Sequence, residues 1–509
     1  MQIAEWLKTA PPKNVTTASV EAIVSRARQM QGALKDGAFP TGSVFERLSD
    51  RAKDEIIRCL RNLNTVMTTT AGYATHTKAN RADEKETIET TLDEIQKGVS
   101  NVCTAVETPF LFNVSKGSGP LPAGDAQGDR DFHRLMAAAD LDAALLLKEA
   151  IMREDPCRYS FEVSYEKLDF TSPTQRENSG SSPRQRRFKL GVLDGHAVIM
   201  ETYKYKEAPD HSGEPPPQTL QQLRKITGLL CHPKRKDFHI LPCVGFFRDR
   251  LRRDLGLVFR PPPAFDSRYR GGLVTLSQLY KMHRLVPLGQ RIHLAWALAT
   301  ATEHFHRVGW VHQSIRSGNI AFTAELSSSS SSPAPESEAA GFQALDEGIN
   351  NQATATSLLD RFDLGNPLLF GFEYSRADDT ATYLEEDHSL ANNLYRIPDR
   401  WGRPAARFEK SHDVYSLGVV LLEIALWKDV CSVVKHSLFG RRVVADEVAK
   451  TLASKCSKAL SHQVGDIFVR CILTCLEFSK QTKGMDEYET QLYFQQSVIT
   501  PIGRALYKV

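Results

Sequence analysis

The chain lacks the segments that direct a protein into or across a membrane. Its first residues, MQIAEWLK, have neither the basic start nor the apolar stretch of a signal peptide, which argues against secretion. The most apolar run, residues 417–427, is interrupted by Glu423 and is far shorter than the ~20 residues that a membrane-spanning helix needs. We therefore expect a cytoplasmic protein in which this run forms a buried core helix.

The cysteines lack the spacing of metal ligands. Nine of them are scattered along the chain, an odd number that fits a reducing compartment. Cys471 and Cys475 lie one helical turn apart and could form a reactive or metal-binding pair, but we favour two small core residues on one helix face. The others are Cys59, Cys103, Cys157, Cys231, Cys243, Cys431 and Cys456.

An excess of charge of one sign is also missing. The 64 basic residues stand against 61 acidic ones, which gives a formal net charge of +3 and disfavours a broad nucleic-acid-binding surface. We expect other proteins as partners, no nucleic acid, and no membrane. The 509 residues, 41% of them hydrophobic, are enough for two or three globular domains of about 100–200 residues each.

The first part of the chain has a helical pattern. Ser43 and Glu46 fit a capping box ahead of an apolar stripe, which predicts a long helix to about residue 78. A second stripe repeats at steps of four and three, close to the heptad period, until Pro109. The two stripes are Leu48, Ala52, Ile56, Leu60, Leu63 and Met67, then Ile88, Leu92, Ile95, Val99, Val102 and Val106.

These stripes predict an all-α bundle of four or five helices within residues 1–155. They contain no group of polar residues that suggests a cofactor or a metal site. We therefore interpret the bundle as an interaction or regulatory domain, with Ile56, Leu60, Ile95 and Val99 facing inward.

Beyond residue 157 the pattern changes to strands. Residues 158–170 and 188–205 read as strands, and Asp194-Gly195 within the second run is a strong hairpin turn. A short helix is expected at 218–230, and strands at 240–247 and 256–260. From residue 276 onward the chain is rich in helical patterns, interrupted by a serine-rich insert at 325–356 whose low complexity predicts disorder.

Two segments in the second half carry a family resemblance. The run SHDVYSLGVVLLEI at 411–424 resembles the start of the large central helix in the C-terminal lobe of protein kinases. In that family the aspartate that matches Asp413 accepts hydrogen bonds from backbone amides of the catalytic loop, and VHQSIRSGNI at 311–320 resembles such a loop.

The resemblance implies a bilobal kinase-like domain over residues 158–480. Its small lobe would span 158–262 and its large lobe 270–480, followed by a C-terminal helical tail at 481–509. His312, Phe372 and Asp413 match positions that support the internal packing of the kinase fold, so we expect them to be buried near the junction of the lobes.

The residues that kinases use for phosphoryl transfer are replaced. Kinase catalytic loops read His-Arg-Asp and then Asn four residues later, where the aspartate positions the substrate hydroxyl and the asparagine holds magnesium. Here His312 and Asn319 are kept, but Ser314 stands at the aspartate position and cannot act as a carboxylate base. Gly371 stands where the magnesium-binding Asp-Phe-Gly motif begins, and a role for the nearby Glu373 as a displaced ligand is disfavoured.

The nucleotide-binding features are weak too. In kinases a Val-Ala-Ile-Lys strand ends in a lysine that anchors phosphate, and the strand that resembles it here ends in Glu201, which would repel phosphate. Lys204 and Lys206 are the alternatives for the anchoring lysine, but Lys204 would point to the strand face opposite Glu201. No Gly-x-Gly-x-x-Gly motif lies between the first strands, and the helix at 218–230 contains no acidic residue that could pair with an anchoring lysine. The expected hinge, where kinases recognise adenine through backbone groups, contains Pro261–Pro263, which lack N–H groups. We expect no cofactor, with Asn319 as a residual nucleotide-site residue.

The chain also resembles fungal kinase-like proteins related to heterokaryon-incompatibility and prion-inhibition (HeLo-type) factors. The resemblance lies in the segment HRVGWVH at 306–312 and in the helical bundle predicted within residues 1–155. It lacks the apolar start typical of such bundles. The expected function is a catalytically inactive, kinase-like signalling or scaffold protein. The alternatives are an atypical active kinase that uses Ser314 or Glu373, and a membrane-acting cell-death effector.

Overall fold

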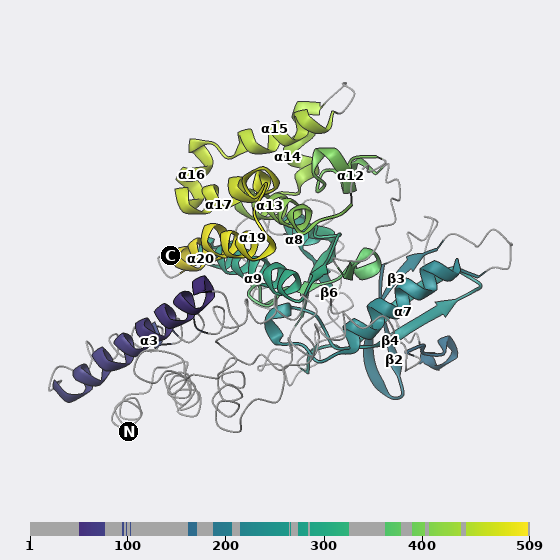
Figure 1. Cartoon of the computed structure of the whole chain (residues 1–509). Coiled ribbons are helices and arrows are strands. Elements are labelled where there is room, and N and C mark those ends of the chain that lie inside the picture. The colour runs from purple at the N-terminus through teal and green to yellow at the C-terminus, as the bar shows by residue number, and fades with distance from the viewer. Residues whose placement is uncertain are drawn as a thin grey trace, which may run out of the picture. The chain divides into compact units, whose positions relative to one another are not determined.

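The computed structural model describes residues 50–76, 94–95, 98, 102, 161–169, 187–205, 214–263, 265, 273–282, 286–324, 362–377, 389–402, 407–438 and 444–506. The chain divides into two compact units, Met1–Glu149 and Ala150–Val509. Among the residues that the structure describes, no helix is long and apolar enough to cross a membrane. Figure 1 shows the elements of both units, which are described separately below.

The first unit contains the helix α3, Asp50–His76, close to the predicted end near residue 78. Its buried side chains are Ile56, Cys59, Leu60, Leu63 and Met67, which recur at the three- and four-residue steps of one helix face. Ile95 and Val102, from the second stripe, are also buried, and Gly98 lies directly against Leu63. Val99 and most of the expected bundle lie outside the described residues, so the number of helices stays a prediction.

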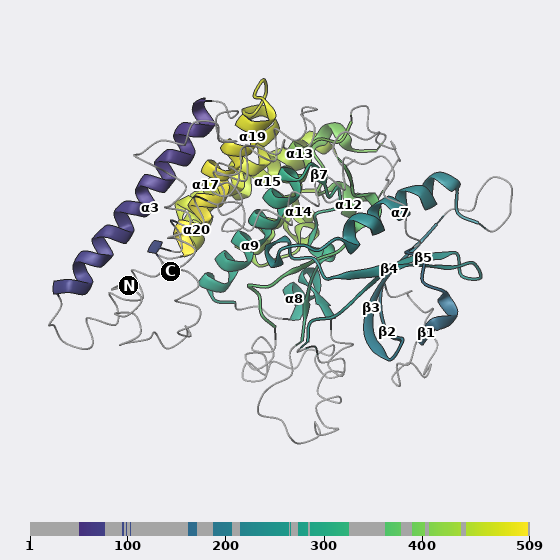
Figure 2. The ribbon, with the colours of Figure 1, turned by 60° about the horizontal axis from the view of Figure 1, so that its bottom comes forward.

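The second unit begins with a five-stranded antiparallel sheet in the order β1-β2-β3-β5-β4. The strands are β1 (Leu168–Asp169), β2 (Phe188–Leu193), β3 (His196–Lys204), β4 (Cys243–Asp249) and β5 (Asp254–Phe259). Between β2 and β3, Asp194 and Gly195 both have positive φ, at 49° and 79°, as the predicted two-residue hairpin turn requires. The helix α7 (Pro217–Cys231) packs against β4 and lies across the sheet (Figures 1 and 2).

Alternation along β3 places its side chains on two different faces of the sheet. Val198 and Met200 join one apolar cluster with Phe247 and Val258. Ile199 and Glu201 lie on the other face, where Phe259 and Phe370 meet with ring centroids 5.4 Å apart. Glu201 is therefore a carboxylate on a buried sheet face, with none of its surface exposed.

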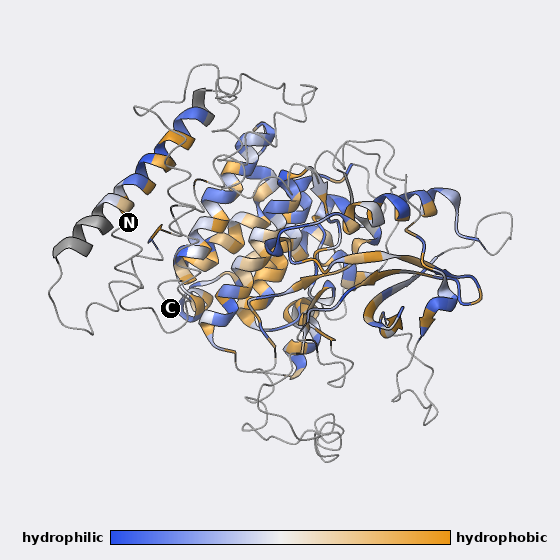
Figure 3. Cartoon of the chain, turned by 90° about the horizontal axis from the view of Figure 1, so that it is seen from below, coloured by the Kyte–Doolittle hydropathy of each residue, from blue (hydrophilic) through white to orange (hydrophobic). Residues whose placement is uncertain are grey.

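The rest of the second unit is mostly helical, as the sequence predicted. Two long helices, α9 (Leu288–Arg307) and α13 (Lys410–Leu426), pack against each other, and nearly every side chain of α13 is buried. Figure 3 shows the apolar colour of this region concentrated where its helices face one another. The other helices are α8 (Leu276–Met282), α12 (Leu390–Asn393), α14 (Val430–Leu438), α15 (Ala445–Lys455), α16 (Lys458–Val464), α17 (Asp466–Leu476) and α18 (Phe478–Gln481).

Short strands and 3-10 turns lie between these helices in the chain. β6 (Leu273–Thr275), β8 (Ile320–Thr323) and β9 (Leu368–Leu369) form a three-stranded sheet, and β7 (Trp310–Val311) pairs with β10 (Arg376–Ala377). Short 3-10 turns occur at η2 (Tyr165–Lys167), η3 (Lys236–Phe238), η5 (Ser317–Asn319), η6 (Phe372–Tyr374) and η7 (Pro398–Arg400). The insert at 325–356 lies outside the described residues.

The region that the sequence predicts as a C-terminal helical tail packs into the same core. It contains α19 (Glu487–Phe494), a π-helix, η8 (Gln495–Ile499), and α20 (Thr500–Leu506). α20 contacts both α9 and α17, and Phe494, Val498 and Ile502 are buried. These helices complete the packing around α9 and are not an appendage.

Candidate functional site

The loop between β7 and β8 is held by Asp413, a fully buried residue in the first turn of α13. Its carboxylate accepts hydrogen bonds from the backbone N–H groups of His312, at 2.7 Å, and Gln313, at 2.9 Å. The φ of Gln313 is 63°, a left-handed conformation that costs a non-glycine residue about 1–2 kcal/mol. Asp413 thus anchors a strained turn, through the backbone hydrogen bonds that the sequence predicted.

The other two positions expected in the packing of the fold meet at the same place. The ring centroids of His312 and Phe372 are 4.8 Å apart, and both residues are buried. Burial lowers the pKa of His312 to about 4, so its imidazole is neutral near pH 7. The Ser375 hydroxyl donates to the His312 carbonyl at 2.9 Å, which ties the segment after Gly371 to the loop.

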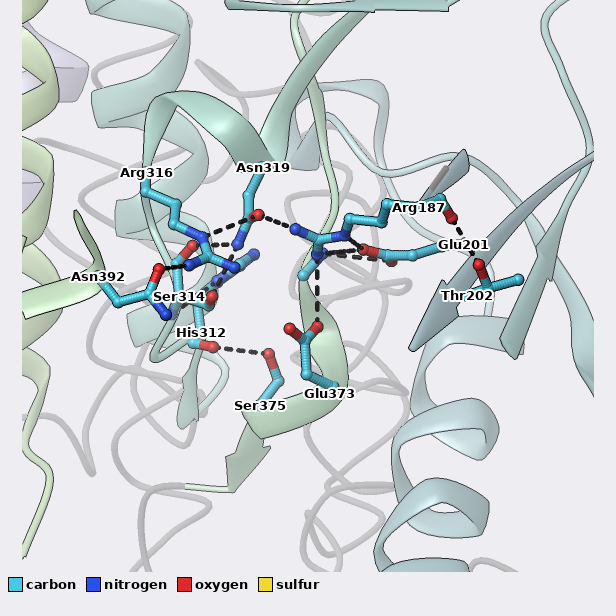
Figure 4. A network of polar contacts seen from close by, with 11 residues as sticks. Arg187, Glu201, Thr202, His312, Ser314, Arg316, Asn319, Glu373, Ser375 and Asn392 are labelled. Carbon is cyan, nitrogen blue, oxygen red and sulfur yellow. Dashed lines mark hydrogen bonds and ion pairs between the residues drawn. The ribbon is translucent and has the colours of Figure 1, made fainter. Parts of the chain in front are cut away.

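Glu201 faces Arg187, the residue that directly precedes β2. The Arg187 guanidinium donates to Glu201 Oε1 through Nε, at 2.9 Å, and also through Nη2 (Figure 4). The Gly371 N–H donates to both oxygens of the same carboxylate, at 2.9 and 3.2 Å. Burial nevertheless raises the pKa of Glu201 to about 7, against the effect of the Arg187 charge.

The same guanidinium extends the network to two further residues of the site. Arg187 donates to the Asn319 side-chain oxygen and forms an ion pair with Glu373 at 3.5 Å. The Asn319 oxygen also accepts from Arg316 Nε at 3.1 Å, and Arg316 donates in turn to Asn392. Asn319, which was predicted to remain from a nucleotide site, is therefore buried and bonded to protein groups.

Ser314, which the kinase resemblance matches to a catalytic aspartate, belongs to the same network. The Asn319 amide nitrogen donates to the Ser314 hydroxyl at 2.7 Å and to its carbonyl at 2.6 Å. Gly371 has a φ of 90°, and a Cβ built on it would lie 2.2 Å from Asn319 Nδ2. Restoring an aspartate at position 371 would therefore strain the backbone and disrupt Asn319.

Lys204, one of the two alternatives to Glu201 as a phosphate anchor, does not reach the network. Lys204 is about half exposed and pairs with Asp254 at 3.1 Å, while Lys206 lies outside the described residues. In α7, Gln222 donates to the Ser375 carbonyl at 2.9 Å. After β5, the Arg260 N–H donates to the Pro242 carbonyl at 2.9 Å, so this amide is already engaged before the proline run.

Sequence reasoning missed Arg187, although one signal contained the information. The hairpin turn at Asp194-Gly195 pairs Leu193 with His196, and the antiparallel register then pairs Phe188 with Glu201. The register therefore brings the backbone of Arg187, one residue earlier, close to Glu201, although strand alternation does not determine which face its side chain takes. A buried glutamate in an apolar strand needs such a cation.

Within the described part of the chain, no group of three or more histidine, cysteine, aspartate or glutamate residues could hold a metal ion. Comparison of the sequence with protein-family models and with curated proteins found no match. The functional argument therefore rests on the residues of the site.

Proposed function

We propose that the second unit is a kinase-like domain without phosphoryl-transfer activity, and that the protein works in signalling or as a scaffold by binding other proteins. The observation that carries the proposal is the ion-pair network around Arg187. Two guanidinium groups, of Arg187 and Arg316, and two carboxyl groups, of Glu201 and Glu373, share this site. Their formal charges cancel when both carboxyls are ionised, and because the pKa of Glu201 is about 7, the site offers a phosphate at most a partial positive charge near neutral pH.

The same network argues against a catalytic metal. Magnesium prefers oxygen ligands, and in kinases an aspartate and an asparagine supply them. Here Gly371 has no side chain, and the Asn319 oxygen already accepts hydrogen bonds from two arginines. A magnesium ion at this place would have to displace both guanidinium groups and would sit beside their positive charges.

A general base is missing as well. The Ser314 hydroxyl accepts a hydrogen bond from Asn319, and a hydroxyl cannot take a proton near neutral pH as a carboxylate does. Phosphoryl transfer depends almost wholly on positioning and electrostatic stabilisation of one transition state. Repair of a single residue therefore leaves the other losses in place.

The test is phosphate transfer from ATP to a generic peptide by the purified full chain, with magnesium and with manganese. Wild type, Ser314→Ala and Ser314→Asp are compared, with an active kinase as the assay control. We expect no transfer by any of the three. Turnover by wild type that Ser314→Ala abolishes would contradict the proposal and identify an atypical kinase.

The proposed role in binding other proteins rests on the balanced charge of the chain, which disfavours nucleic acid. One described side chain is suited to such a contact. Leu251, in the turn between β4 and β5, is 98% exposed. If this leucine contributes to binding, Leu251→Asp weakens the interaction with a partner while the fold stays intact.

A further inference from the structure

Two cysteines far from the Arg187 network lie at the contact between α7 and β4. Cys231 is the last residue of α7 and Cys243 is the first residue of β4. The two elements pack against each other, and the two thiols are close enough to interact. Neither cysteine is in a disulfide in this structure.

The two thiols have different surroundings. Cys243 is buried, and its thiol also lies 3.5 Å from the Gly245 carbonyl, where β4 is irregular. Cys231 is only partly buried, so small reagents can reach it. An accessible thiol beside a buried one is the arrangement of an attacking cysteine and a resolving cysteine.

A lysine supplies positive charge to this pair. The Lys234 ammonium is largely buried, donates to the carbonyls of Leu230, at 2.8 Å, and His232, at 2.7 Å, and interacts electrostatically with both thiols. The neighbouring Cys243 thiol lowers the pKa of Cys231, helped by the Lys234 charge, whereas burial raises the pKa of Cys243. Cys231 is thus the thiol of the two that more readily becomes a thiolate.

We propose that Cys231 and Cys243 form a redox-active dithiol that hydrogen peroxide oxidises to an intramolecular disulfide. The Cys231 thiolate attacks one peroxide oxygen, the O–O bond breaks, and protonation of the departing hydroxide gives water and a sulfenic acid on Cys231. The Cys243 thiol then attacks the Cys231 sulfur, the S–S bond forms, and a second water leaves. Two thiols are oxidised and one peroxide is reduced to two waters, so the step balances.

The disulfide would join α7 covalently to β4. Because α7 also contacts the segment after Gly371 through Gln222 and the Ser375 carbonyl, oxidation would fix the helix that borders the site. A chain that binds partners through this domain would then respond to peroxide without any catalytic activity. The dithiol itself does not depend on the proposed function.

The chain provides two internal controls. Cys471 and Cys475 are the pair that sequence spacing suggests, but both are buried in α17 and burial raises the pKa of each. Cys431 is exposed, yet partial burial of its thiol and the nearby Asp429 raise its pKa to about 11. Exposure alone thus predicts that Cys431 is alkylated first, whereas the proposal predicts Cys231.

The experiment treats the reduced full chain with hydrogen peroxide near pH 7.5, blocks the remaining thiols, and maps tryptic peptides by mass spectrometry. We expect peptide 226–234 linked to peptide 237–248, loss of this link in Cys231→Ser, and its retention in Cys471→Ser. The oxidised protein should melt several degrees higher than the reduced protein.

A second measurement needs no variant. In the reduced wild type, we expect iodoacetamide to alkylate Cys231 at least tenfold faster than Cys431. Absence of the linked peptides from folded wild type, or faster alkylation of Cys431, would overturn the proposal. A link between Cys471 and Cys475 in place of the expected one would do so too.

Discussion

Replacement of Asp413 by asparagine tests how the loop at His312 and Gln313 is held. Asparagine keeps the shape of the side chain but replaces one carboxylate oxygen by an NH₂ group, which cannot accept a hydrogen bond. Oδ2 of the native residue accepts from the His312 N–H, and Oδ1 accepts from the Gln313 N–H. Either orientation of the amide therefore leaves one backbone donor facing another donor.

The size of the effect follows from these contacts. A hydrogen bond to a charged group contributes about 1.5–3 kcal/mol, and a buried donor without an acceptor costs about 1–3 kcal/mol. We expect Asp413→Asn to lower the free energy of unfolding of the second unit by about 2–4 kcal/mol. Once the loop is released, relaxation of the strained φ of Gln313 favours its movement away from the native position.

Urea unfolding followed by tryptophan fluorescence measures this loss. Trp310 is buried, with its ring centroid 5.8 Å from that of Phe372, so its emission reports on the loop. The matched control is Asp466→Asn, which changes an exposed carboxylate in the first turn of α17 and should cost about 1 kcal/mol or less. Equal losses for the two variants would refute the claim that Asp413 anchors the loop.

Three further predictions concern buried or strained positions. Burial raises the pKa of Glu423 to about 8. Because the folded state keeps a proton on Glu423 that the unfolded state releases above pH 4.5, this group should lower the free energy of unfolding by up to about 1.4 kcal/mol per pH unit from there to pH 8. The fall should be smaller in Glu423→Gln, where Glu201, with a pKa of about 7, still contributes; parallel pH profiles would disprove it. Gly371→Ala should destabilise more than Gly195→Ala in thermal melts, since both glycines have positive φ but only Gly371 faces another side chain within 4 Å; equal losses would count against the close approach to Asn319. In urea titrations Leu251→Ala should change the free energy of unfolding by less than about 0.5 kcal/mol and Leu255→Ala by about 2–5 kcal/mol, because Leu251 is exposed and Leu255 is buried; similar values would place the β4–β5 hairpin in another register.

Local signals in the sequence were sufficient for the elements around the site. The Asp194-Gly195 turn requires positive φ at both positions, which few residue pairs tolerate, and it is found as predicted. The apolar run after Asp413 identified α13 as a buried helix because hydrophobic side chains cover its whole circumference. The hydrogen bonds that Asp413 accepts from the loop amides were expected from the resemblance of residues 311–320 and 411–424 to kinase segments.

Contacts between distant segments could not be predicted in the same way. Arg187 and Asn319 are 132 residues apart in the chain, and they meet because the start of β2 in one sheet lies near the start of β8 in another. Cys231 and Cys243 come together because α7 packs on β4, whereas their sequence spacing resembles no motif. The pair Cys471 and Cys475, which has the more suggestive spacing, is a buried part of α17, as favoured from the sequence.

The most direct test of the central claim is nucleotide binding by wild type and Glu201→Gln, measured by calorimetry with and without magnesium. The claim is that the Arg187–Glu201 pair occupies and neutralises the place where a kinase holds phosphate. At about pH 8.5, where a carboxyl group with a pKa of about 7 is ionised, removal of the Glu201 charge should strengthen ATP binding at least tenfold, or by about 1.4 kcal/mol, with no gain from magnesium. Tight, magnesium-dependent ATP binding by the wild type, weakened or unchanged in Glu201→Gln, would contradict the account.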